Sequence, residues 1–307
     1  EFRIGFKCFS YCLKLDKFVI PSFITIIDTL AFDGCKNLTE IKIPSSVTTI
    51  EGKAFQYCSS LAEINIPSSV EIINEEVFLE CISITKIEIP NSVKQIGKSS
   101  FKNCKLLNSI TLPSSLISIE ENLFEGCSSL TKIVIPSSVE SINQFAFYKC
   151  KSLKEVNIPS SVKTIKSCAF NGCSSLELVL FESNSKIVVI DSYVFENCLS
   201  LRKIEIPSSV KLIKRFAFKN CKSLNEIVID PSIQQIQNKV FDGCESLDLN
   251  SIPSSKQMIK IPIDVDPIKM NVVILGSFLV GKKSIVRRYA RNEFYEDHVS
   301  MIGSDFL

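Results

Sequence analysis

Apolar and polar positions recur along most of the chain with a period of 23 residues. One unit reads IPSSVTTIEGKAFQYCSSLAEIN, from Ile43 to Asn65. Proline stands at the same point of seven successive units, at positions 21, 44, 67, 90, 113, 136 and 159. Glu182 takes the next place, two additional residues follow within ESNSK, and the period resumes at Pro207, Asp230 and Pro253. A fixed period of this length is typical of solenoids built from stacked coils.

Each unit predicts one short strand, a turn, and a return to the core. Ile64 and Ile66 are two residues apart, so they point to one face of a strand. Pro67 ends that strand because it has no N–H for the hydrogen-bond ladder, and Pro-Ser-Ser then turns the chain. Later in each unit a Val, an Ile, a Phe and a Cys are expected to be buried. The units are marked by Phe9, Phe32, Phe55, Phe78, Phe101, Phe124, Phe147, Phe170, Phe195, Phe218 and Phe241.

The pattern resembles the BspA-like class of leucine-rich repeats. Its hallmark, L-x-x-I-x-I-P-x-S-V-x-x-I-x-x-x-A-F-x-x-C, recurs over residues 1–255. The resemblance implies a leucine-rich-repeat parallel β-solenoid of eleven 23-residue coils. In that class the repeats serve as binding surfaces, often on cells, and no catalytic residues accompany them. The first predicted domain is therefore this solenoid, over residues 1–255.

Eleven of the thirteen cysteines keep the same period. Cys8 and Cys168 do not, and we expect both to be exposed. Metal ligands or disulfides are one reading of such a row. A small, weakly polar residue that fills a fixed core position is the reading we favour. No C-x-x-C pair occurs, and the single histidine, His298, lies far from the row, which gives a zinc site little support. A row of stacked thiols also favours the reducing cytosol.

Strand side chains that point away from the core form the concave face of leucine-rich repeats, where a protein partner is expected. Here these pairs are Glu40/Lys42, Glu63/Asn65, Lys86/Glu88, Ser109/Thr111, Lys132/Val134, Glu155/Asn157, Leu178/Leu180, Lys203/Glu205 and Glu226/Val228. Most form an ordinary solvated face of mixed charge. Leu178 and Leu180 are the exception, and they lie just before the two-residue insertion, where we expect a bulge and an apolar patch together. The alternative is that the irregular coil turns both leucines inward.

The period fades after Pro253. Residues 256–267 contain Pro262 and Pro267 and are predicted to be an edge coil that runs into a linker. Residues 268–307 then read as an incomplete α/β P-loop segment. A buried strand is expected at 270–275, a Gly-x-x-x-x-Gly-Lys loop at 276–282, and a helix at 284–291. This order is the context that a phosphate-binding loop requires.

The last forty residues resemble the start of a small GTPase of the Ras superfamily, specifically of the Rab branch. The stretch NEFYEDHVSMIGSDFL, residues 292–307, is similar to the switch I segment and second strand of Rab proteins. By this resemblance, nucleotide would be held by Gly276, Val280, Gly281, Lys282, Lys283, Ser284 and Phe294. An intact relative would bind GTP and magnesium.

The segment also departs from that family. Lys283 stands where the family has the Ser or Thr that binds magnesium, and Met301 stands where it has the switch I threonine. Both metal-ligand positions are therefore replaced, and we expect no metal site. The later guanine-reading motif and strands are absent from these residues. We accordingly expect no enzyme activity from the chain as given, no cofactor, and at most weak guanine nucleotide binding. Two alternatives stay open: a longer parent chain that is a small GTPase, or a degenerate fusion.

Composition narrows the remaining choices. Residues 268–307 hold six Lys/Arg and four Asp/Glu of the 35 and 33 in the chain, which leaves 29 of each sign in residues 1–267. That neutral balance argues against nucleic acid as a partner, and the short apolar runs argue against a membrane span. No signal peptide is visible, although a preceding segment could contain one.

Three functions remain open. The one we favour is a protein-interaction scaffold in the cytoplasm, carrying a degenerate GTP-binding segment. The others are a Rab-like regulatory GTPase with a repeat arm, at a membrane surface, and a cell-surface adhesin.

Overall fold

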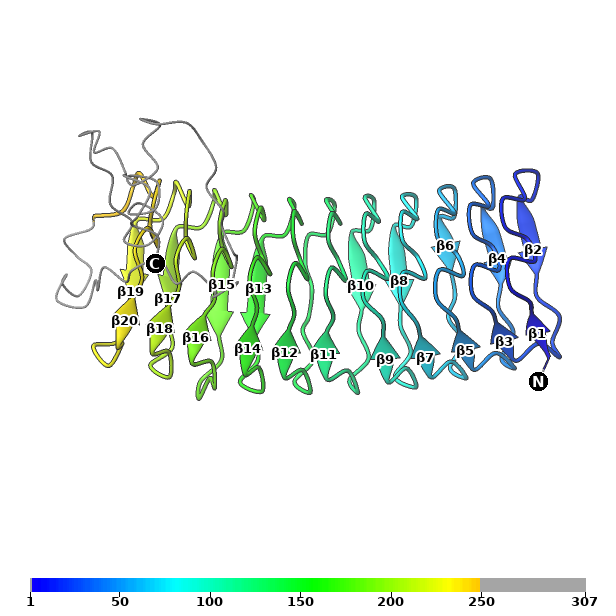
Figure 1. The fold of residues 1–307 in the computed structure, drawn as a ribbon, viewed down its shortest axis with the longest axis horizontal. Coiled ribbons are helices and arrows are strands. Elements are labelled where there is room, and N and C mark those ends of the chain that lie inside the picture. Colours follow the sequence, from blue (N-terminus) through cyan, green and yellow to red (C-terminus); the bar gives the residue numbers. More distant parts are fainter. Residues whose placement is uncertain (1, 249–307) are drawn as a thin grey trace, which may run out of the picture. The chain divides into compact units, whose positions relative to one another are not determined.

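The computed structural model describes residues 2–248, which form an elongated stack of coils with the strands of successive coils side by side (Figure 1). Every strand pairing in this part of the chain is parallel, as expected when each coil repeats the path of the one before. The predicted parallel β-solenoid with 23-residue coils is confirmed over these residues. The predicted edge coil, linker and P-loop segment lie outside them.

One row of strands follows the Leu-x-x-Ile-x-Ile part of each repeat, and we name it the first ladder. Its strands are β2 (Lys17–Val19), β4 (Glu40–Lys42), β6 (Glu63–Ile64), β8 (Lys86–Glu88), β10 (Ser109–Thr111), β13 (Glu155–Ile158), β15 (Leu178–Phe181), β17 (Lys203–Glu205) and β19 (Glu226–Val228). Between β10 and β13, the rung at Lys132 is a single bridge to Glu155. Burial alternates as predicted: Ile64 and Ile66 are buried, whereas Glu63 and Asn65 are exposed.

A second row of strands runs where the apolar residues return to the core, and we name it the second ladder. Its members are β1 (Arg3–Ile4), β3 (Ile26–Ile27), β5 (Thr49–Ile50), β7 (Ile72–Ile73), β9 (Gln95–Ile96), β11 (Ser118–Ile119), β12 (Ser141–Ile142), β14 (Thr164–Ile165), β16 (Val189–Ile190), β18 (Leu212–Ile213) and β20 (Gln235–Ile236). The sequence predicted burial here but not a strand, because one alternation of polar and apolar residues is too short to signal one.

The number of coils needs a correction. We expected eleven coils from eleven phenylalanines, whereas the residues described make about ten turns. The eleven strands of the second ladder enclose ten intervals, and the first ladder has ten rungs when the bridge at Lys132 is counted. A phenylalanine marks one corner of a coil, so counting corners adds one to the number of complete turns.

The phenylalanine corner supplies a third row of bonds between coils. The N–H of Phe32 donates to the carbonyl of Ala54 in the next coil at 2.8 Å, and the equivalent bond joins Phe101 to Leu123 at 3.0 Å. The second bond matters because the second ladder is interrupted between β9 and β11. The corner row therefore holds adjacent coils together at a point where the strands do not pair.

The phenylalanine rings stack in a column through the core. Successive centroids lie 5.0 to 5.8 Å apart with interplanar angles of 4 to 16°. The nine rings from Phe32 to Phe218 are completely buried. Offset stacking of this kind adds a favourable ring–ring contribution to the burial of each side chain.

Each corner also contains two residues in the left-handed backbone region, four positions apart. In one coil they are Lys53 and Tyr57, with φ of 62° and 59°. Other coils place Gly34, Gly126, Gly172 or Gly243 at the second position, where glycine has no Cβ to strain the turn. Asparagine, which also tolerates this region, occupies several of the others. The corner is therefore tight enough to bend the chain twice within five residues.

The Pro-Ser-Ser turn is tied to the neighbouring coil by its second serine. Val47 N–H donates to Pro44 O within the turn at 3.1 Å. Ser46 Oγ donates to Ile24 O of the preceding coil at 2.6 Å, and Ser69 Oγ donates to Val47 O at the same distance. The same bond recurs at Ser92, Ser115, Ser138, Ser161 and Ser209, so in most of the repeats this serine supplies a partner for a carbonyl of the preceding coil.

Candidate interaction surface

Two columns of side chains project outward from the first ladder, and together we name them the exposed ladder face. Column A contains Lys17, Glu40, Glu63, Lys86, Ser109, Lys132, Glu155, Leu178, Lys203 and Glu226. Column B contains Val19, Lys42, Asn65, Glu88, Thr111, Val134, Asn157, Leu180, Glu205 and Val228. All are exposed to solvent except Glu40, which is half-buried. The face predicted from the repeat is therefore present.

Leu178 and Leu180 both point to solvent. They are 38% and 51% exposed, whereas Val179 between them is buried. The alternative in which the irregular coil turns them inward is wrong. The predicted bulge is wrong too, because Glu155–Ile158 of β13 pairs with Leu178–Phe181 of β15 in unbroken register. The two additional residues are accommodated after β15, where the chain turns, so the strand itself needs no irregularity.

In the turn after β15, Glu182 occupies the position that is proline in most repeats. Its carboxylate accepts a hydrogen bond from Asn157 Nδ2 at 3.1 Å and another from the main-chain N–H of Ser160 at 3.0 Å. Both donors belong to the preceding coil. The longer turn is therefore fastened to its neighbour, and Asn157, beside Leu180 in column B, is held in place.

Two further apolar side chains extend the patch around the leucines. Val134 is 69% exposed and Val228 is 46% exposed, and both are in column B. A hollow of about 240 Å³ lies between Val134 and Leu180 and is also lined by Lys132, Glu155 and Asn157. The sequence alone could have indicated these two valines, because they occupy the same repeat position as Leu180. They did not stand out as part of a patch, because the neighbouring positions in the sequence pattern are mostly charged or polar.

A larger hollow of about 400 Å³ lies over β4, β6 and β8. Its outward side chains are charged or polar: Glu40, Lys42, Glu63, Asn65, Lys86 and Glu88. Water solvates such side chains well, so a partner gains little by covering them. The apolar region is the better candidate for binding.

Ion pairs flank the apolar patch. Lys132 Nζ lies 2.8 Å from Glu155, and Lys203 Nζ lies 2.8 Å from Glu226 and 3.3 Å from Glu205. Hydrogen bonding to Glu155 raises the pKa of Lys132, and hydrogen bonding to Glu226 raises the pKa of Lys203. The two lysines are thus positively charged near neutral pH and paired with glutamates along column A.

The cysteine row is a core feature. All thirteen cysteines lie within residues 2–248 and are free thiols. Burial raises the pKa of Cys35 to about 11, and it raises the pKa of Cys104 further. Of the two cysteines outside the period, Cys8 is exposed, whereas Cys168 is only half-buried and burial raises its pKa as well. Our expectation that both would be exposed is therefore correct for Cys8 alone.

The predicted nucleotide-binding residues lie outside the part of the chain that the structure describes. They are Gly276, Val280, Gly281, Lys282, Lys283, Ser284 and Phe294, with Met301 at the second metal-ligand position. Their proposed roles stay predictions. Within residues 2–248, no helix has the length and apolar character needed to cross a bilayer.

The coil geometry and the exposed ladder face define a leucine-rich-repeat solenoid. The chain belongs to the family described as BspA type leucine rich repeat region (6 copies), which matches residues 3–128, 71–189 and 188–262. The match confirms the resemblance seen in the repeat. It ends at residue 262, so it gives no support to a Rab-like segment at 268–307.

Several solved structures are similar to this chain. A leucine rich cell surface protein from Faecalibacterium prausnitzii A2-165 is 28% identical, with 80% of this chain and 82% of that chain covered and a TM-score of 0.47. A leucine-rich repeat protein from Bacteroides ovatus is 26% identical, with 80% of each chain covered and a TM-score of 0.44. The T. pallidum leucine rich repeat protein is 31% identical, covering 57% of this chain and 71% of that chain, with a TM-score of 0.46. A comparison with curated proteins finds no match.

Proposed function

We propose that this chain is a protein-interaction scaffold whose binding site is the exposed ladder face centred on Leu178 and Leu180. The observation that carries the proposal is the grouping of exposed apolar side chains there. Val134, Leu178, Leu180 and Val228 all project from the same face within five rungs. Burying such side chains against a partner contributes about 25 cal/mol per Å² of apolar area removed from water.

The repeat array suits this role because it is rigid. The rungs are held by strand pairing, by the corner hydrogen bonds and by the stacked phenylalanine rings. A surface whose backbone is fixed loses little conformational entropy when a partner covers it. Leucine-rich-repeat proteins typically bind protein partners, and extended repeat surfaces serve for such contacts.

The C-terminal segment would add a second element to this function. Its resemblance to Rab proteins favours a degenerate phosphate-binding loop around Lys282, with weak guanine nucleotide binding. A regulatory GTPase in which the repeat array selects partners is the corresponding alternative. The row of reduced thiols supports the cytoplasm, and the adhesin alternative places the same binding face on a cell surface.

Site-specific photo-crosslinking tests the proposal. A photo-reactive amino acid at position 180, within the patch, is compared with one at position 111, which is exposed in the same column three rungs away. We expect protein adducts from position 180 and few from position 111. Equal labelling at both positions, or adducts from neither, would contradict a binding site at the leucines. The masses of the adducts distinguish a second copy of this chain from a different protein.

A further inference from the structure

Residues on the five rungs around β15 are arranged so that the exposed ladder face is complementary to itself. Along column A the order is Lys132, Glu155, Leu178, Lys203, Glu226. Along column B it is Val134, Asn157, Leu180, Glu205, Val228. In column A, positions at equal distances from the central leucine carry opposite charges. In column B, the positions two rungs from the central leucine are both valine.

From this pattern we propose that two copies of the chain associate face to face about a two-fold axis parallel to β15. This inference rests on the proposed function, since it uses the same face and names a second copy of this chain as the partner. Rotation about such an axis places β15 opposite β15 of the second copy and β13 opposite β17. It places the rung at Lys132 opposite β19.

The contacts across the axis match in column A. Lys132 faces Glu226 of the second copy, and Glu155 faces Lys203. Within one chain these residues already form the pairs Lys132–Glu155 and Lys203–Glu226, each at 2.8 Å. Two ion pairs would therefore meet in opposite orientation and form a ring of four alternating charges. Networks of this kind are more favourable than isolated surface pairs.

The contacts in column B are apolar at the same rungs. Val134, which is 69% exposed, faces Val228, which is 46% exposed, and Leu180 lies at the centre, 51% exposed, facing its own copy. Asn157 faces Glu205 and has an amide N–H available beyond the one that it donates to Glu182. The association would bury four of the exposed large apolar side chains of each chain, which gives it a hydrophobic centre.

The other face-to-face arrangement does not match. A two-fold axis along the stack of coils would bring each rung onto itself and column A onto column B. Lys132 would then cover Val134, and Glu226 would cover Val228, so charged groups would lose water against apolar side chains and gain no partner across the interface. The order of residues along the ladder therefore selects the axis parallel to β15.

The contact between the two copies is small, so we expect a low affinity. Five rungs at a spacing of about 4.8 Å enclose four intervals and span about 19 Å, so the dimer belongs among weak associations. Sedimentation velocity of the whole chain should show a monomer at low loading and a shift toward dimer as the concentration approaches the millimolar range. Leu180→Lys should remove the shift. Val19→Lys, on the same face but outside the five rungs, should retain it.

A charge inversion gives the sharpest test. The variant Lys132→Glu, Glu155→Lys, Lys203→Glu, Glu226→Lys retains opposite signs within each chain and between two inverted copies. A mixture of inverted and wild-type chains brings like charges together at all four positions. We expect each protein alone to dimerise with similar affinity and the mixed dimer, measured by energy transfer between labelled copies, to be at least about tenfold weaker.

Two results would overturn the proposal. One is a wild-type chain that stays monomeric at every concentration, and the other is a mixed dimer as strong as the two homodimers. Neither result bears on whether a different protein binds at position 180, which the crosslinking experiment tests separately. Failure of self-association and failure of the scaffold function can therefore be told apart.

Discussion

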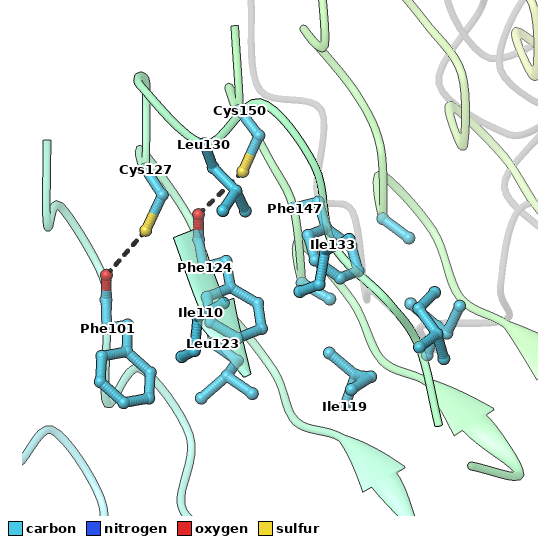
Figure 2. Packing of buried hydrophobic residues seen from close by; sticks show 14 of the residues in the cluster. Phe101, Ile110, Ile119, Leu123, Phe124, Cys127, Leu130, Ile133, Phe147 and Cys150 are labelled. Carbon is cyan, nitrogen blue, oxygen red and sulfur yellow. Dashed lines mark hydrogen bonds between the residues drawn. The ribbon is translucent and has the colours of Figure 1, made fainter. Parts of the chain in front are cut away.

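Cys127 Sγ donates a hydrogen bond of 3.1 Å to the main-chain oxygen of Phe101, one coil earlier (Figure 2). The same bond recurs along the row, from Cys35 to Cys244, at 3.0 to 3.3 Å. It explains why the position holds cysteine rather than another small apolar residue. The thiol fills the core and also satisfies a buried carbonyl, which an alanine or valine leaves with one partner fewer.

Removal of one phenylalanine ring tests the alignment of the coils. Phe124 is completely buried between Phe101 and Phe147, with centroids 5.7 and 5.4 Å away. Phe124→Ala should lower the free energy of unfolding by about 3–5 kcal/mol, because a cavity remains in a stack that cannot collapse around it. Urea denaturation measures the loss. Phe23→Ala, at a ring that is 59% exposed, is the control and should cost much less; similar midpoints for both would refute the alignment.

Thiol reactivity should separate the three environments of cysteine. A thiolate reacts only where it is accessible and forms readily. Alkylation of the native protein should therefore modify Cys8 first, Cys168 more slowly, and Cys104 and Cys127 only on unfolding. Peptide mapping over a time course measures the order. Rapid modification of Cys104 in the folded protein would show that the row is not core.

The buried carboxyl group of Asp33 should make stability depend on pH. Burial raises its pKa above the ordinary value near 3.8, so the folded state holds the proton more firmly than the unfolded state. Its stabilising contribution is present below that ordinary value and is lost as pH rises through the raised value. Asp33→Asn should therefore increase stability at neutral pH and give no gain in acid below the ordinary value.

A second effect adds to that gain. Gln56 Nε2 donates to Asp33 Oδ1 at 3.3 Å, while Gln56 Oε1 is buried and has no hydrogen-bond partner within residues 2–248. An asparagine amide can donate to that oxygen once the Gln56 side-chain amide turns over, which should contribute about 1 kcal/mol. Asp28→Asn, which weakens the ion pair with Arg3, is the control and should give no increase. Equal denaturation midpoints for Asp33→Asn and the wild type at neutral pH would show that the buried charge of Asp33 does not destabilise the fold.

Nucleotide binding by the C-terminal segment should be weak and independent of magnesium. Lys283 and Met301 stand at the two positions where the Rab family has metal ligands, and magnesium neutralises charge between the β- and γ-phosphates. Titration calorimetry with GTP and ATP, with and without magnesium, should show at most weak binding, little preference for guanine, and no hydrolysis. Tight binding that requires magnesium and selects guanine would mean that Ser284 serves as the ligand.

Much of the solenoid could be predicted because every repeat carries the same information. The alternation around Ile64 and the placement of Phe55 and Cys58 in the core followed from period and residue type, and the structure confirms them. The second ladder could not be predicted, since Thr49 and Ile50 form a strand only because neighbouring coils offer a partner. The left-handed backbone conformation of Lys53 and Tyr57 could not be predicted for a similar reason. The stacking of the coils imposes this conformation on residues that do not prefer it.

Only part of the candidate binding site could be predicted from the sequence. Leu178 and Leu180 stood out because they are adjacent and apolar, but their orientation depended on how the two additional residues were accommodated. The structure accommodates them after β15, where Glu182 accepts hydrogen bonds from the preceding coil, and so the strand keeps its register. Val134 and Val228 belong to the same apolar patch only because their rungs lie close to β15 in space. The repeat pattern in the sequence does not give the distances between rungs.

The double variant Leu178→Lys with Leu180→Lys tests the binding site at these leucines when binding and stability are measured together. The affinity for the protein captured by crosslinking at position 180 is measured by calorimetry, and the denaturation midpoint is measured on the same samples. Because both leucines are exposed, we expect the affinity to fall at least about tenfold while the midpoint stays near that of the wild type. Unchanged affinity, or a double variant that unfolds much earlier, would contradict a binding site at these leucines.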